Sequence, residues 1–75
     1  MLTKLDNYDY EINDGFIRLR MSGMNDPDMV DVMSEIDRSN GRIYVESRYF
    51  RYLGYQLVPA SDRTVYMDLD VEEAL

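Results

Sequence analysis

The chain has 75 residues with 15 Asp and Glu against 8 Lys and Arg, a formal net charge of −7, and no histidine, cysteine or tryptophan. The missing residue types exclude disulfides, thiolate metal sites and histidine-dependent catalysis, and the negative charge disfavours direct binding to nucleic acid or to anionic membranes. One domain spanning residues 1–75 is expected at this length, and we expect a soluble, cytoplasmic protein because cysteine, a long apolar run and a signal-like N-terminus are all missing.

A β-hairpin is the first predicted element. Apolar and acidic residues alternate over Tyr8–Ile12, which is the period of a half-buried strand. An Asp-Gly turn signal lies within residues 13–15, and Phe16–Met21 then resumes the alternation. The segment partly resembles a calcium-binding loop, but its glycine is one place late and Arg20 stands where the final glutamate belongs. A hairpin turn therefore explains these residues better.

A helix is predicted from Pro27 to Ser39. Asp26 is the expected N-cap, with proline at the first helical position, and residues 40–41 supply an Asn-Gly C-cap. This capping role explains the local acids better than a cation site does. The apolar stripe at helical spacing comprises Met29, Val30, Val32, Met33 and Ile36. The acids predicted for the opposite side are Asp28, Asp31 and Glu35.

Strands dominate the remaining sequence. Arg42–Glu46 and Tyr55–Val58 are rich in β-branched and aromatic residues, and the second must end before a proline. Ser47–Gly54 is consistent with either a twisted strand or a short helical turn. Val65–Val71 alternates cleanly, and residues 72–75 are expected to be a frayed acidic tail. The side chains predicted to face inward in the last strand are Val65, Met67, Leu69 and Val71.

These elements predict a small α+β domain. Their order is β-β-α-β-β-β, and the economical arrangement is one antiparallel sheet of four or five strands packed on one amphipathic helix. A chain this short buries a limited core, and without disulfides or thiolate metal sites, oligomerisation or docking on a larger partner is the remaining source of additional stability.

Catalysis is not predicted. Asp68 and Asp70, or Asp9 and Glu11, are two apart on a strand and so lie roughly 6.6 Å apart on one face, a spacing that suits a glycosidase pair. We expect both pairs on the solvated side of the sheet, without the burial that shifts a carboxyl pKa into a catalytic range. We therefore expect no enzyme, no cofactor and no metal ion.

An aromatic and arginine-rich segment spans Arg42 to Arg51 and leaves three interpretations open. Its residues suit packing in a thin core, a protein interface, or a surface for single-stranded nucleic acid. Tyr and Arg are enriched in protein interfaces. Glu46 and the acidic surroundings weigh against nucleic acid. The interleaved residues are Arg42, Tyr44, Arg48, Tyr49, Phe50, Arg51 and Tyr52.

The sequence favours a binding protein that docks on a basic surface of a larger protein, and nucleic-acid-binding proteins are one class of partner with such a surface. Regularly spaced carboxylates can occupy a basic groove as mimics of nucleic-acid phosphates, although they also serve simply to solvate exposed strands and helices. Acids speed association, and desolvated tyrosines hold a complex together. The predicted steering acids are Asp28, Asp31, Glu35, Asp68 and Asp70, and the predicted apolar anchors are Tyr49, Tyr52 and Tyr55.

In size, charge and lack of catalytic residues, the chain is similar in type to small phage-encoded inhibitors. These include anti-CRISPR, anti-restriction and uracil-DNA glycosylase inhibitor proteins, and the similarity implies inhibition or modulation of the partner. The similarity is one of composition and transfers no site residue. The alternative hypothesis is a homodimeric or otherwise self-assembling accessory subunit with no inhibitory role.

Overall fold

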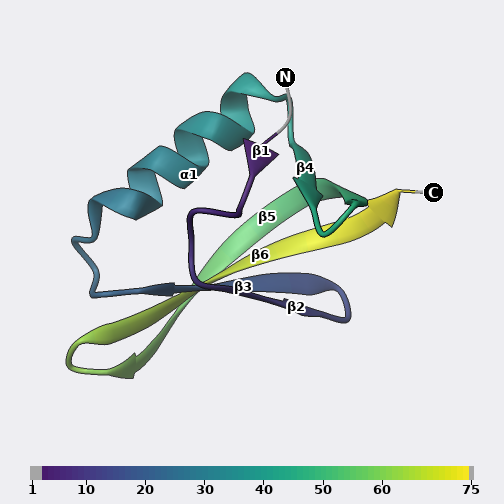
Figure 1. Ribbon diagram of the computed structural model, residues 1–75. Helices are drawn as coiled ribbons and strands as arrows, with labels where there is room; N and C mark the ends of the chain where they lie inside the picture. Colours follow the sequence, from purple (N-terminus) through teal and green to yellow (C-terminus); the bar gives the residue numbers. More distant parts are fainter. Residues whose placement is uncertain (1–2, 75) are drawn as a thin grey trace.

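A curled sheet with one helix lying against it makes up the fold (Figure 1). The computed structural model describes residues 3–74. Its strands follow the spatial order β1-β4-β5-β6-β3-β2. The elements are β1 (Thr3–Lys4), β2 (Tyr10–Asn13), β3 (Phe16–Met21), α1 (Pro27–Arg38), β4 (Arg42–Val45), β5 (Arg48–Ser61) and β6 (Thr64–Ala74). The α+β class, with one helix and a mainly antiparallel sheet, is thus confirmed.

Strand β1 was not predicted. It is two residues long and pairs in parallel with β4, with Thr3 opposite Ile43 and Lys4 opposite Tyr44. Two residues are too few to show a hydrophobic period, so the sequence gives no signal for this strand.

The segment Ser47–Gly54, which was ambiguous in the sequence, is extended. Glu46 and Ser47 take positive φ angles of 51° and 60° in a tight turn, and β5 begins immediately afterwards at Arg48. The strand then pairs antiparallel with β6, with irregularities at Tyr52/Gly54 and Pro59/Ser61. β5 is therefore one long strand of 14 residues rather than a helical turn followed by a short strand.

The expectation of a frayed tail is wrong for the described residues 72–74, while Leu75 lies outside them. β6 continues to Ala74 and pairs with the beginning of β5. Glu72 lies 3.3 Å from Arg51, and Glu73 lies 2.6 Å from Arg48. Cross-strand ion pairs and ladder hydrogen bonds hold a segment whose acidic composition alone indicated a free tail.

Both helix ends are capped by the residues that the sequence indicated. Asp26 accepts a hydrogen bond from the Asp28 backbone N–H over 2.9 Å. At the other end, Gly41 N–H donates to Ile36 C=O and Asn40 N–H donates to Asp37 C=O, which is a Schellman motif. Asn40 has the left-handed backbone that this motif requires, with φ 56°, and Gly41 also has a positive φ of 78°.

The core lies between α1 and the inner face of the sheet. The four inward residues predicted for β6 are buried, as are the alternate residues of β3. From α1 only Val32 and Ile36 are buried, whereas Val30, predicted to belong to the apolar stripe, is 68% exposed. Residue 30 lies too far around the helix from residues 32 and 36 to reach the sheet. The other core residues are Leu5, Ile17, Leu19, Met21, Ile43, Val45 and Phe50.

Candidate docking surface

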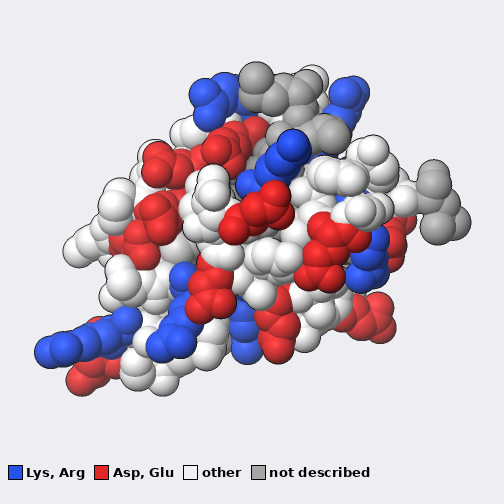
Figure 2. Space-filling view, viewed as in Figure 1, with Lys and Arg blue, Asp and Glu red and all other residues white. Residues whose placement is uncertain are grey.

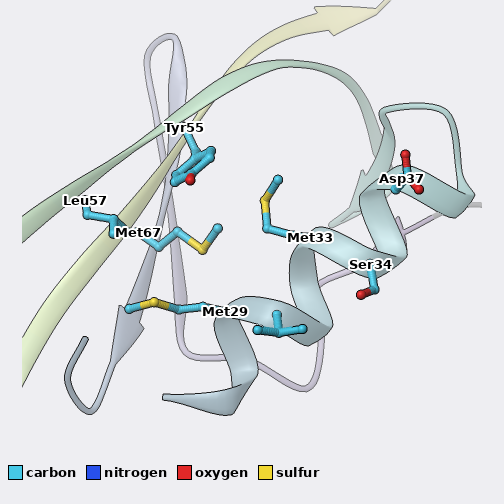
Figure 3. Close-up of a pocket in the computed structure, with 8 residues that line it drawn as sticks. Met29, Met33, Ser34, Asp37, Tyr55, Leu57 and Met67 are labelled. Atoms are coloured by element: carbon cyan, nitrogen blue, oxygen red, sulfur yellow. The ribbon is translucent and has the colours of Figure 1, made fainter. Parts of the chain in front are cut away.

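An open apolar groove runs between α1 and the β5–β6 hairpin (Figure 3). Met29 and Met33 line it from the helix, and Tyr55 and Leu57 line it from β5. The buried side chain of Met67 forms part of its lining from β6. We call this feature the α1–β5 groove; its volume is about 410 Å³, within the range of ligand-binding clefts. The other lining residues are Val30, Ser34 and Asp37.

The groove opens to solvent and is not an internal cavity of the core. Tyr55 is 49% exposed and Val30 68% exposed, so large apolar side chains stand in solvent at its sides. Methionine side chains are flexible and adapt to differently shaped partners. A second hollow of about 310 Å³ adjoins the groove, because Met33 and Asp37 line both. These large apolar side chains around an open groove make it a candidate docking surface.

Tyr52 lies beside the groove, near the helix C-terminus, and packs against the core. Its hydroxyl lies 4.0 Å from the sulfur of Met33, and its side chain lines the second hollow. Burial raises the pKa of the Tyr52 hydroxyl above its ordinary value, and the negative charge of Asp70 raises it further. The hydroxyl donates a weak hydrogen bond to the Met33 sulfur, which joins β5 to α1.

The acids Asp28, Asp31 and Glu35, here called the acidic row, lie on the other flank of α1. Burial raises the pKa of the Tyr8 hydroxyl, and the acidic row raises it further, which places these carboxylates near Tyr8. Within the described residues, none of the three forms an ion pair. Figure 2 shows acidic side chains following the helix. The row is therefore a source of negative charge without an ion-pair partner among the described residues, on the flank of α1 opposite the groove.

Asp68 lies on the outer face of the sheet, between the inward-facing Met67 and Leu69, but it is covered there and not solvated as we expected from the sequence. Its side chain is 12% exposed, and its two carboxylate oxygens accept hydrogen bonds from Arg18 at 2.8 and 3.0 Å. Arg18 in turn lies over the rings of Phe16 and Tyr66. Asp70 is half-buried, opposite Gly54. Because Asp68 is engaged within the sheet, it is poorly suited to the steering role predicted for it.

Tyr49 lies away from the groove, at the far end of the sheet. Its ring packs against Tyr44 with centroids 4.7 Å apart, and it remains 52% exposed. The neighbouring arginines of the aromatic segment are largely neutralised, because Arg48 and Arg51 pair with Glu73 and Glu72. Phe50 faces the core. Some side chains of the segment therefore pack in the core and others are exposed. The ion pairs reduce the positive charge that binding to nucleic acid would require.

The structure divides the eight predicted site residues among separate surfaces. Tyr52 and Tyr55 adjoin the helix on its groove side, and the acidic row occupies the opposite flank of the same helix. Asp68, Asp70 and Tyr49 lie elsewhere on the sheet. Sequence reasoning assigned Met29, Met33 and Leu57 to ordinary packing and missed their shared groove. The only sequence signal for it was the pair of methionines on α1, four residues apart.

Comparison with protein-family models, with curated proteins and with solved structures gave no match for this chain. No helix in the described part of the chain is long and apolar enough to cross a membrane. Over residues 3–74, the acidic side chains form no group of three or more arranged to hold a metal ion.

Proposed function

We propose that this protein binds a larger protein through the α1 side and thereby inhibits or modulates that partner, whose docking surface is basic. One observation carries the proposal: within the described residues the acidic row has no cationic partner, and it shares a helix with an exposed apolar groove. The sheet acids Asp68, Glu72 and Glu73 are by contrast paired with arginines.

The two flanks of α1 supply different contributions to binding. The acidic row accelerates encounter with a basic surface and makes the association rate dependent on salt. The groove supplies apolar area, from Val30 and Tyr55 in particular, that slows dissociation once water is displaced. No catalytic step is part of this proposal.

Charge-matched variants test the proposal. The triple variant Asp28→Asn, Asp31→Asn, Glu35→Gln changes the net charge from −7 to −4, since three acids are removed. A control with Glu11→Gln, Asp14→Asn and Asp62→Asn has the same net charge, but its changes lie in exposed parts of the β-hairpins. Both are immobilised beside the wild type, and the proteins retained from a lysate are compared.

At low salt, we expect the wild type and the control to retain a set of proteins that the helix variant does not retain. Their association rate with the wild type should fall at least about tenfold between roughly 50 and 500 mM salt. Equal retention by the helix variant and its control would show that the acidic row contributes no more to capture than three acids elsewhere on the surface do. That result would refute docking through α1.

Self-association is the second candidate function, favoured by Tyr49, which is 52% exposed and packs on the half-buried Tyr44, and by Leu53, which is 55% exposed. These residues offer apolar area without added negative charge. Sedimentation of the isolated protein distinguishes the candidates, because a strict monomer at high micromolar concentration would exclude a functional dimer.

A further inference from the structure

One edge of β5 is open beside the α1–β5 groove. β5 pairs with β6 along nearly its whole length, but β4 pairs only with Arg48–Arg51 on its other side. In the part of the chain that the structure describes, no strand pairs with that side between Gly54 and Pro59. Figure 1 shows the β5–β6 hairpin extending well past β4. Proteins usually cover, charge or distort such an edge, because its backbone groups can pair with another strand.

The hydrogen-bond phase of the sheet determines which backbone groups point outward. Val71 N–H donates to Gly15 C=O over 3.0 Å, so Val71 and every second residue before it face β3. The intervening residues of β6 face β5 and exchange hydrogen bonds with their partners there, which are Gly54, Gln56 and Val58. The residues whose backbone groups point to the open edge are therefore Tyr55, Leu57 and Pro59. A proline is tolerated on such an edge because its missing N–H breaks no ladder hydrogen bond.

The outward-facing residues are also the ones whose side chains meet the groove. Tyr55 and Leu57 both line it, since residues two apart on a strand share a face. A strand added to this edge would lie about 4.8 Å from β5. Every second side chain of that strand would point into the space between β5 and the methionines of α1. Main-chain pairing and side-chain pockets are the two components of recognition by strand addition.

The charge around the groove favours a basic occupant. Asp37 is the charged residue of its lining. The helix as a whole carries four acids and one arginine, which gives it a net charge of −3. A second copy of this chain would bring another −7 to the same place and be repelled.

We propose that a basic, extended segment of the partner protein adds to the open edge of β5 as a further strand and inserts alternate apolar side chains into the α1–β5 groove. The proposal rests on the function proposed above and specifies how the partner is held. The stretch between the two β5 irregularities is six residues, 54–59, or about 20 Å of strand. The segment therefore presents about three apolar side chains.

Amide hydrogen exchange of the full chain tests the proposal with a defined probe. The probe is the capped peptide Lys-Val-Lys-Val-Lys-Val-Lys, and its control carries N-methyl groups on the valines, which cannot donate to a strand. In the free protein, the amides of Gln56 and Val58 should be protected and those of Tyr55 and Leu57 should exchange rapidly. At saturating peptide, we expect protection of Tyr55 and Leu57 to rise about tenfold or more.

The control peptide should leave those two amides unprotected. Absence of protection at millimolar probe, or equal protection by the N-methyl peptide, would overturn strand addition. Protection of Tyr55 and Leu57 that grows with protein concentration alone would overturn it in favour of β5 pairing with a second copy.

A protein variant separates this proposal from the proposed function. Leu57→Pro removes an outward N–H, while Gln56→Ala, on the opposite face of β5, serves as the matched control. Retained protection of Val58 shows that each variant keeps the β5–β6 ladder. Leu57→Pro should weaken capture of the partner at least about tenfold relative to Gln56→Ala. If Leu57→Pro captures the partner as well as the control does, and the acidic-row variant does not, strand addition is wrong and docking through α1 stands.

Discussion

Arg18 on β3 and Asp68 on β6 are directly opposite in the strand register and are joined by two hydrogen bonds of 2.8 and 3.0 Å. Hydrogen bonding to Asp68 raises the pKa of the Arg18 guanidinium above its ordinary value. A paired carboxylate of this kind is a structural component of the sheet, in contrast to the unpaired acids of α1.

Asp68→Asn should lower the melting temperature more than Asp70→Asn does. The substitution leaves Arg18 between two aromatic rings without its carboxylate partner, whereas no ion pair of Asp70 is broken within the described residues. The expected difference is a few degrees, measured by thermal unfolding at low salt. Equal melting temperatures of the two variants would show that the Arg18–Asp68 ion pair adds no stability beyond that of an amide in place of the Asp68 carboxylate. Binding to the partner should be unchanged in Asp68→Asn.

Asp26→Ala should destabilise the protein by about 0.5–2 kcal/mol at neutral pH, as removal of a helix N-cap does. Hydrogen bonds from the Ser22 and Asp28 backbone N–H groups lower the pKa of the Asp26 carboxyl below its ordinary value of 3.8. Because the folded pKa is the lower one, the stabilisation is complete above about pH 4 and is lost as the pH falls through the folded value. Urea unfolding of wild type and variant at pH 7 and at decreasing pH checks this. A difference that stays constant down to pH 2 would contradict a role for the charge.

Gly41→Ala should cost about 1–2 kcal/mol, because Gly41 has φ +78° and alanine is strained in the left-handed region. The added Cβ would lie 3.6 Å from the Tyr52 Cβ, an ordinary contact, so backbone strain is the main cause. Asn40→Gly is the matched control, since glycine accommodates the φ of +56° at that position without strain. Urea denaturation should show the first variant destabilised and the second near wild type.

Truncation after Val71 should destabilise the protein clearly, because it removes the β6 residues that pair with Tyr49, Phe50 and Arg51. Phe50 is 5% exposed in the intact chain, and its exposure would cost up to about 3 kcal/mol. Chemical denaturation measures the change. The double variant Glu72→Gln, Glu73→Gln retains the strand and should lose much less stability. A truncated protein as stable as the full chain would mean that the segment is a free tail after all.

The alternation and capping signals of the sequence were sufficient to predict several elements. Hydrophobic alternation identified the inward face of β6, and Asp26 and Gly41 marked the ends of α1 because their side-chain and backbone requirements are local. The Asp-Gly turn located the β2–β3 hairpin for the same reason. These features depend on residues within about four positions of one another.

Relationships between distant segments were decided only by the tertiary structure. Whether Asp68 or Asp70 meets an arginine depends on the register of β3 against β6, which brings together residues 50 positions apart. The groove exists because Met29 and Met33 face Tyr55 and Leu57 across a gap, and the open edge of β5 exists because β4 stops short of it. The sequence by itself determined α1, the β2–β3 hairpin, the inward face of β6 and the excess of negative charge. The packing of the sheet determined which charges are neutralised and which backbone groups remain unpaired, because both depend on contacts between residues far apart in the chain.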